Sequence, residues 1–119
     1  MCPNLFIVDD EPEICEILSD LLSEEFDSRW ESNAKTALEL LPEIRPALVI
    51  FDLGLNEMRG VDFLTQALAI APNTRFVLCT GSSPTSPDVA AALKAGAVGA
   101  IYKPFPARDT LIATLKGWL

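Results

Sequence analysis

The chain has 119 residues, a length typical of one folded domain, and half of its residues are hydrophobic. We therefore expect one domain over residues 1–119 with a sizeable core, which excludes a separate catalytic, DNA-binding or membrane module within the chain. The net charge of −8 argues against direct binding to nucleic acid or anionic membranes, because both require a basic surface. The charge is uneven: residues 1–71 carry 15 acidic and 4 basic residues, whereas residues 72–119 carry 2 and 5.

Histidine is absent, which excludes His-based catalytic triads, His metal ligands and phosphohistidine carriers. The three cysteines, Cys2, Cys15 and Cys79, have neither the number nor the spacing of a disulfide framework or a zinc site. Cys15 and Cys79 lie in apolar runs, so we expect both to pack in the core, and Cys2 lies near the exposed start. The sequence begins without a signal peptide and contains no apolar run near the ~20 residues of a membrane span, so we expect a cytoplasmic protein.

Short apolar runs alternate with helical patterns along the whole chain. The expected strands cover residues 4–8, 28–31, 47–51, 75–79 and 98–102. The expected helices cover residues 12–25, 33–44, 60–71, 87–95 and 108–119. Pro12 suits the first turn of the first helix, and Ser32 or Asn33 can cap the second. Pro46 stops the second helix, and Gly96 closes the fourth.

Five strand–helix units with continuously apolar central strands predict an α/β fold, in which helices cover both faces of a parallel sheet. The flavodoxin-like (βα)5 three-layer sandwich, with strand order 2-1-3-4-5 and right-handed crossovers, is the natural arrangement for such units. Ligands of this fold bind at the C-terminal ends of the strands, near the switch between the first and third strands.

Acidic residues follow two of the expected strands. Asp9, Asp10 and Glu11 follow the first, and Asp52 follows the third. Carboxylates gathered in one crevice repel one another unless a cation lies among them, and Mg²⁺ prefers such oxygen ligands. The alternative is that these acids are ordinary solvated loop residues or helix caps, but acids at the ends of two neighbouring strands favour a metal site.

The fourth and fifth strands end in groups that suit a phosphoryl group. Thr80 and Ser82 can donate hydrogen bonds to phosphoryl oxygens, and Lys103 can neutralise their charge. Asp52 is then free to act as a nucleophile toward phosphorus. The alternative for Lys103 is a purely structural ion pair.

Four stretches at these strand ends carry a family resemblance: FIVDDEPEI (residues 6–14), VIFDLGLNEMRGVDFL (49–64), VLCTGSS (77–83) and AGAVGAIYKPF (95–105). With them in this order, the chain resembles the receiver domain of two-component response regulators, of the CheY-like superfamily, from end to end. The resemblance implies a receiver domain over residues 1–119. It also implies phosphoryl transfer from the phosphohistidine of a sensor histidine kinase or a histidine phosphotransfer protein.

The resemblance further implies how the metal site is built. Asp52 would be the phosphoacceptor and a ligand of Mg²⁺. Asp10 would bind the ion directly, and Asp9 would act mainly through metal-bound water. The backbone carbonyl of Gly54 would complete the protein ligands.

Thr80 matches the switch hydroxyl of the family and Lys103 its lysine, so with Asp52 they form the implied catalytic group. The bond between Lys103 and Pro104 is implied to be cis. Phosphorylation would draw Thr80 and Lys103 inward and change the output face, which would bind an effector domain or a second copy of the chain. That face comprises the helix over 87–95, the strand over 98–102 and the helix over 108–119. The exposed side of the helix over 12–25 is implied to bind the kinase.

Several positions depart from the family pattern: Gly54, Asn56, Ser82 and Ala100. Ala100 stands three residues before the lysine, where many receivers carry an aromatic switch residue. Tyr102, directly before Lys103, is not its equivalent, because adjacent strand residues face opposite sides. Switching would then depend on the backbone of the loop that begins at Gly81 or on a rearrangement of the helix over 87–95. The small residues Gly54 and Ser82 leave the phosphoryl lifetime open.

Other functions fit the sequence less well. A haloacid dehalogenase-type phosphatase needs a second aspartate two residues after the nucleophile, where this chain has Gly54. A flavodoxin-type cofactor site needs a Ser/Thr/Gly loop after the first strand, where this chain has acids. A pseudo-receiver, which uses the same fold as a phosphorylation-independent interaction module, stays open, as does membership of a longer regulator.

Overall fold

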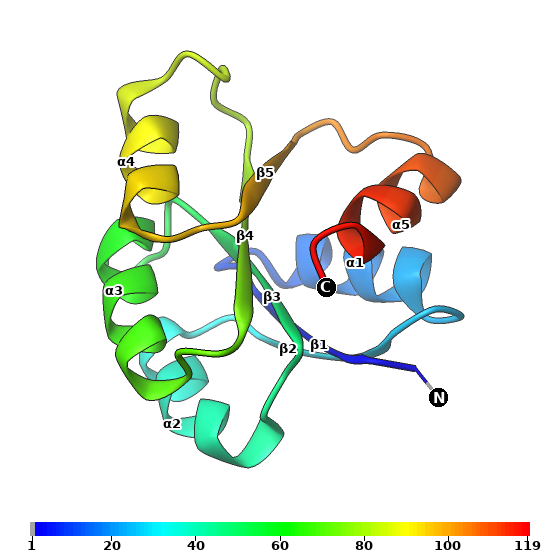
Figure 1. Ribbon diagram of the computed structural model, residues 1–119, viewed down its shortest axis with the longest axis horizontal. Helices are drawn as coiled ribbons and strands as arrows, with labels where there is room; N and C mark the ends of the chain where they lie inside the picture. The colour runs from blue at the N-terminus through cyan, green and yellow to red at the C-terminus, as the bar shows by residue number, and fades with distance from the viewer. Residues whose placement is uncertain (1) are drawn as a thin grey trace.

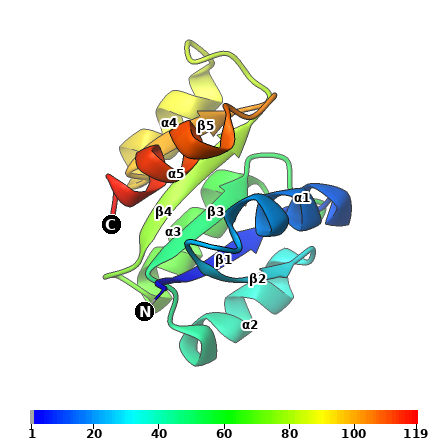
Figure 2. The same ribbon diagram turned by 90° about the vertical axis from the view of Figure 1, so that its right-hand side faces the viewer.

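The computed structural model describes residues 2–119. They form a parallel sheet with helices on both faces (Figures 1 and 2). The strands are β1 (Asn4–Val8), β2 (Asp27–Glu31), β3 (Leu48–Asp52), β4 (Arg75–Thr80) and β5 (Gly99–Tyr102). The helices are α1 (Pro12–Leu22), α2 (Ala34–Ile44), α3 (Gly60–Ile70), α4 (Pro87–Ala95) and α5 (Arg108–Lys116). The strand order is β2-β1-β3-β4-β5, and every pairing is parallel. The predicted flavodoxin-like fold and strand order are confirmed.

The sheet divides the core into two layers. Helices α1 and α5 cover one face, and α2, α3 and α4 cover the other (Figure 2). Along β1, Leu5 and Ile7 belong to the layer under α1 and α5, whereas Phe6 and Val8 belong to the opposite layer. All four are fully buried, because both faces of an inner strand are covered. This double burial explains why the inner strands are apolar at every position.

Most element ends match the expectation, the others differ by one residue, and α1 and α5 end three residues earlier than predicted. Helix α1 ends at Leu22 rather than residue 25: beyond it the N–H groups of Ser23 and Glu25 donate to carbonyls only three residues back, those of Asp20 (3.5 Å) and Leu22 (3.1 Å). Arg108 of α5 donates from Nε to the carbonyl of Leu21 (3.0 Å) and pairs with Glu24 (2.9 Å). A tertiary contact therefore caps this helix, and local sequence carries no signal for it.

Helix α5 ends at Lys116, not residue 119. Trp118, which lies beyond the helix, packs against β5, where a Cβ atom on Gly99 would lie 2.1 Å from its ring. Gly99 therefore makes room for the indole of Trp118, which is partly buried against the layer under α1 and α5. At the other end of the chain, Cys2 is exposed, while Cys15 and Cys79 are buried as predicted.

Asn33, one of the two expected caps, begins α2: its Oδ1 accepts the N–H of Thr36 at 2.9 Å. The helix ends at Arg45, which adopts a left-handed conformation with φ of 47°. No helix within residues 2–119 has the length and apolar character needed to cross a membrane.

Gly60, the first residue of α3, lies against the end of β3. A Cβ atom at Gly60 would lie 2.6 Å from the carbonyl oxygen of Asp52 and 2.6 Å from Cα of Leu53. These are backbone atoms that cannot rotate away, so we predict that Gly60→Ala lowers the free energy of unfolding by about 1–3 kcal/mol in urea denaturation. Gly54→Ala is the matched control, because nothing lies within 4 Å of its added Cβ. Equal stability of Gly60→Ala and Gly54→Ala would contradict this packing.

Candidate metal centre

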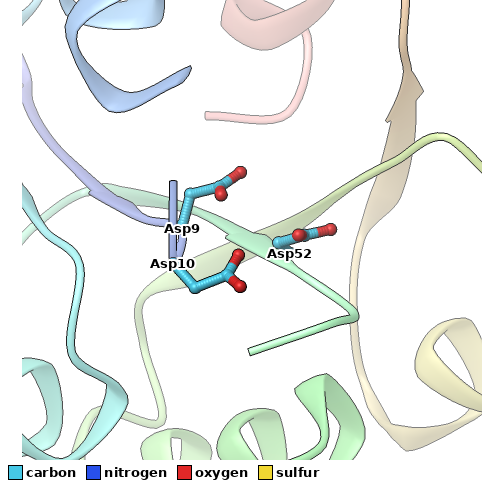
Figure 3. A group of neighbouring side chains, drawn as sticks. All are labelled: Asp9, Asp10 and Asp52. Carbon is cyan, nitrogen blue, oxygen red and sulfur yellow. The ribbon is translucent and has the colours of Figure 1, made fainter. Parts of the chain in front are cut away.

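Three carboxylates meet at the C-terminal edge of the sheet. Asp9 and Asp10 follow β1, and Asp52 is the last residue of the neighbouring strand β3. Because Val8 pairs with Phe51 in a parallel register, the two strands end at the same level. One oxygen from each of the three aspartates lies within 4.8 Å of the others, and Figure 3 shows the three side chains next to one another at the ends of the two strands.

This arrangement fits a hard cation. Three carboxylates at such separations repel one another, and a divalent ion would relieve that repulsion. Carboxylate oxygens are the ligands that Mg²⁺ takes in proteins, with water completing its coordination. The sequence predicted that Asp9, Asp10 and Asp52 would gather here, and the structure brings them together.

Asp9 is the most enclosed of the three, with 2% of its surface exposed. One of its oxygens accepts the N–H of Glu11 (2.9 Å), and the other accepts a hydrogen bond from Nζ of Lys103 (3.4 Å). Burial raises the pKa of Asp9 from 3.8 to about 6. The N–H of Glu11 and the charge of Lys103 oppose this rise in pKa, whereas the charge of Asp52 adds to it.

Lys103 lies between two acids. Its Nζ is 3.4 Å from Asp9 and 3.8 Å from Asp52. Burial tends to lower the pKa of Lys103, but the charges of Asp52 and Asp9 outweigh burial and raise it. Burial raises the pKa of Asp52 despite the opposing effects of Lys103 and of the N–H groups of Leu53 and Gly54. The lysine thus serves as the counterion that the carboxylates share.

Thr80 ends β4 and is 2% exposed. Its Oγ1 accepts the N–H of Ser82 at 3.0 Å, which leaves the hydroxyl proton free to donate elsewhere. Thr80 lies on an open pocket of about 500 Å³. The residues that line this pocket are Glu11, Asp52, Leu53, Gly54, Thr80, Gly81, Ser82, Asp88 and Lys103.

Two residues that line this pocket, Leu53 and Asp88, were not predicted from the sequence, and Asp88 is the charged one. It lies in the first turn of α4, after the loop that follows Thr80. The available signal was topological: helices of a parallel α/β sheet begin at the edge where the strands end, so first-turn side chains lie beside the site. An acid there adds to the negative charge around the pocket.

Ala100, Tyr102 and Pro104 lie apart from the carboxylates. They border a separate pocket of about 330 Å³ on β5 and α5. The peptide bond between Lys103 and Pro104 is cis, as expected. The register of β4 and β5 pairs Leu78 with Ala100 and Thr80 with Tyr102. Tyr102 therefore lies on the same face of β5 as Ala100, beside Thr80. The reason given for setting Tyr102 aside, that adjacent strand residues face opposite sides, is wrong for these two positions, because they are two residues apart.

Comparisons with known proteins agree with this architecture. The family model of the response regulator receiver domain matches residues 5–116. The DNA-binding response regulator MtrA of Mycolicibacterium smegmatis is 32% identical over 120 residues, which cover 100% of this chain and 51% of MtrA. The chemotaxis protein CheY of Thermotoga maritima is 32% identical over 107 residues, 88% of either chain. The structure of the chemotaxis protein CheY4 of Vibrio cholerae matches with a TM-score of 0.89 at 24% identity over 100% of both chains.

A parallel sheet of order 2-1-3-4-5 with acids at the ends of β1 and β3 defines a doubly wound α/β protein of the receiver type. The family match over residues 5–116 identifies it further: the chain belongs to the response regulator receiver domain family of two-component systems. The chain spans about half the length of MtrA.

Asp9 makes the stability of the metal-free domain depend on pH. Its pKa is raised to about 6 in the folded protein, so the folded state binds the proton more tightly than the unfolded state does. The stabilisation from protonated Asp9 is complete below about pH 4 and is lost as the pH rises through 6. We predict that Asp9→Asn removes this loss and is more stable than the wild type by about 1 kcal/mol at pH 7.

Urea denaturation in EDTA between pH 4.5 and 7.5 measures this difference. Asp20→Asn, on the exposed side of α1, is the matched control and is expected to follow the wild-type pH profile. The same pH dependence in Asp9→Asn and the wild type would rule out Asp9 as the source.

Proposed function

We propose that this receiver domain accepts a phosphoryl group on the carboxylate of Asp52 in a Mg²⁺-dependent reaction. One observation carries the proposal: Asp52 lies within 4.8 Å of two other carboxylates and 3.8 Å from Lys103, on a pocket that Thr80 also lines. Cation ligands, a nucleophile, an ammonium group and a hydroxyl therefore share one space. Phosphoryl transfer requires mainly such positioning and charge compensation.

Asp10, Asp52 and the carbonyl of Gly54 would hold Mg²⁺ directly, and Asp9 would hold it through water. The ion, when bound, offsets the carboxylate charge and accepts an oxygen of the incoming phosphoryl group. A bound cation would also favour the ionised form of Asp52. Burial raises the pKa of Asp52, and the carboxyl group must be ionised to act as a nucleophile.

The chain's own groups then act in defined ways. The carboxylate of Asp52 attacks phosphorus, a P–O bond forms, and the P–N bond to the donor imidazole breaks. Lys103 exchanges part of its contact with Asp9 and Asp52 for a phosphoryl oxygen. The hydroxyl of Thr80, which accepts from Ser82, donates to another oxygen. Because residues 1–119 contain no histidine, the phosphohistidine donor must lie outside this sequence.

Two surfaces suit the implied partners. On α1, Ile17 is 48% exposed between the acids Glu16 and Asp20, which fits docking of a sensor kinase or phosphotransfer protein. The face formed by α4, β5 and α5 would bind an effector domain or a second copy of the chain. The relative MtrA is named as DNA-binding and is about twice as long, so an effector of that kind is part of the proposal. The free cysteines fit a reducing, cytoplasmic compartment.

We predict that incubation with Mg²⁺ and acetyl phosphate increases the intact mass by one phosphoryl group. Asp52→Asn is expected to abolish the increase, because the amide cannot act as the nucleophile, and EDTA is expected to abolish it in the wild type. Asp62→Asn, an exposed acid in the first turn of α3, is the matched control and should be modified like the wild type. A wild type with no mass increase and no spectral change on adding beryllofluoride would contradict the proposal and favour the phosphorylation-independent module.

A further inference from the structure

The loop between β3 and α3, residues 53–59, is closed at its base by backbone contacts. The N–H of Gly60 donates to the carbonyl of Leu53 at 2.8 Å, and Gly54 pairs with Arg59 in an isolated antiparallel bridge. The loop carries Gly54, whose N–H lies near the carboxylate of Asp52 and lowers its pKa. The position of this loop therefore affects the site in two ways. It places the N–H of Gly54 beside the carboxylate of Asp52, and it places the carbonyl of Gly54, the proposed metal ligand.

A side-chain contact holds the tip of the same loop. Nδ2 of Asn33 donates a hydrogen bond to the carboxylate of Glu57, across 24 positions of sequence. Asn33 is itself fixed on two sides. Its Oδ1 accepts the N–H of Thr36 at 2.9 Å, and its own N–H donates to the carboxylate of Glu31 at 3.0 Å. The loop tip is thus tied to an anchor at the junction of β2 and α2.

The strand order explains why this tie bears on the acidic site. Strand β1 lies between β2 and β3, so a link from the β3–α3 loop to the start of α2 passes the end of β1, where Asp9 and Asp10 lie. The link sets how far the loop stands from these acids. Mg²⁺ demands near-octahedral ligands at short distances, so a ligand carbonyl on an untied loop has to be ordered when the ion binds.

We propose that Glu57 is a positioning residue of the metal site: its hydrogen bond to Asn33 holds the β3–α3 loop so that Gly54 faces the carboxylates before any ion arrives. Glu57 does not touch the ion and acts through the loop. The inference rests on the proposed function, since it assumes that the site binds Mg²⁺. It attributes the fixed position of the β3–α3 loop to the hydrogen bond between Asn33 and Glu57.

The test uses Mg²⁺ alone as the probe, titrated against the backbone amide signals of the loop by nuclear magnetic resonance. Glu57→Ala is expected to weaken Mg²⁺ binding by about three- to tenfold, the loss typical of one hydrogen bond. It is also expected to speed hydrogen exchange of the loop amides in the metal-free protein. Glu57→Gln keeps an acceptor oxygen without the charge and is expected to stay within about twofold of the wild type. Glu43→Ala, an exposed acid near the far end of α2, is the matched control.

Reversing the polarity of the bond gives the sharpest comparison. Asn33→Asp keeps an oxygen that can cap the N–H of Thr36, but it loses the donor and places a second carboxylate beside Glu57. This variant is expected to resemble Glu57→Ala. The double variant Asn33→Asp with Glu57→Gln has the wild-type net charge, and the amide of the new glutamine can donate to the new aspartate. It is expected to restore both Mg²⁺ affinity and amide protection.

The outcomes distinguish the positioning role of Glu57 from the metal site itself. Restoration in the double variant supports the positioning role, because neither charge nor loss of the cap accounts for it. If the double variant stays as weak as Asn33→Asp, or if Glu57→Ala matches Glu43→Ala, the positioning role is wrong while the metal site stands. If the wild type shows no saturable response to Mg²⁺, the metal site itself fails and the inference fails with it.

Discussion

Repulsion among Asp9, Asp10 and Asp52, with one oxygen of each within 4.8 Å of the others, is the constraint around which the domain is organised. In the metal-free protein Lys103 is the cation that offsets it, at 3.4 Å from Asp9 and 3.8 Å from Asp52. The parallel strand ends bring the carboxylates together, and burial raises the pKa of Asp9 and of Asp52. The site is therefore held in a state of unfavourable electrostatics, which a divalent ion or a second cationic group relieves. A protein selected for stability alone would replace one of these acids.

Burial of apolar residues on the sheet offsets the electrostatic cost of bringing the three carboxylates together. The inner strands of the sheet are buried on both faces, and the two apolar layers under α1 and α5 and under α2, α3 and α4 supply the favourable free energy of folding. The same parallel order gathers every strand end at one edge, so charge is concentrated there and the remainder of the core stays apolar. Lys103 and Thr80 reach the acids from β5 and β4 because those strands end at the same edge.

Much of the fold and site could be predicted from the sequence, because both follow from local patterns and one rule of topology. Apolar runs predicted the strands, and parallel strand ends predicted that Asp9, Asp10 and Asp52 would meet. The early end of α1 could not be predicted, since Arg108 caps it from α5, 87 positions away from Leu21. The pairing of Thr80 with Tyr102 depends on the register of β4 and β5, which residue spacing alone does not determine. The contact between Asn33 and Glu57 likewise joins residues that only the tertiary structure brings together.

The packing of Trp118 over Gly99 has an optical consequence. The chain contains two tryptophans, and they occupy different environments: Trp30 is 38% exposed on the edge strand β2, whereas Trp118 packs against β5. A soluble collisional quencher should reach the indole of Trp30 more readily, leaving emission weighted toward Trp118. That residual emission reports on the packing between β5 and the end of α5. The domain therefore carries its own fluorophore next to the strand that directly precedes Lys103, and movements of that strand can be followed without an added label.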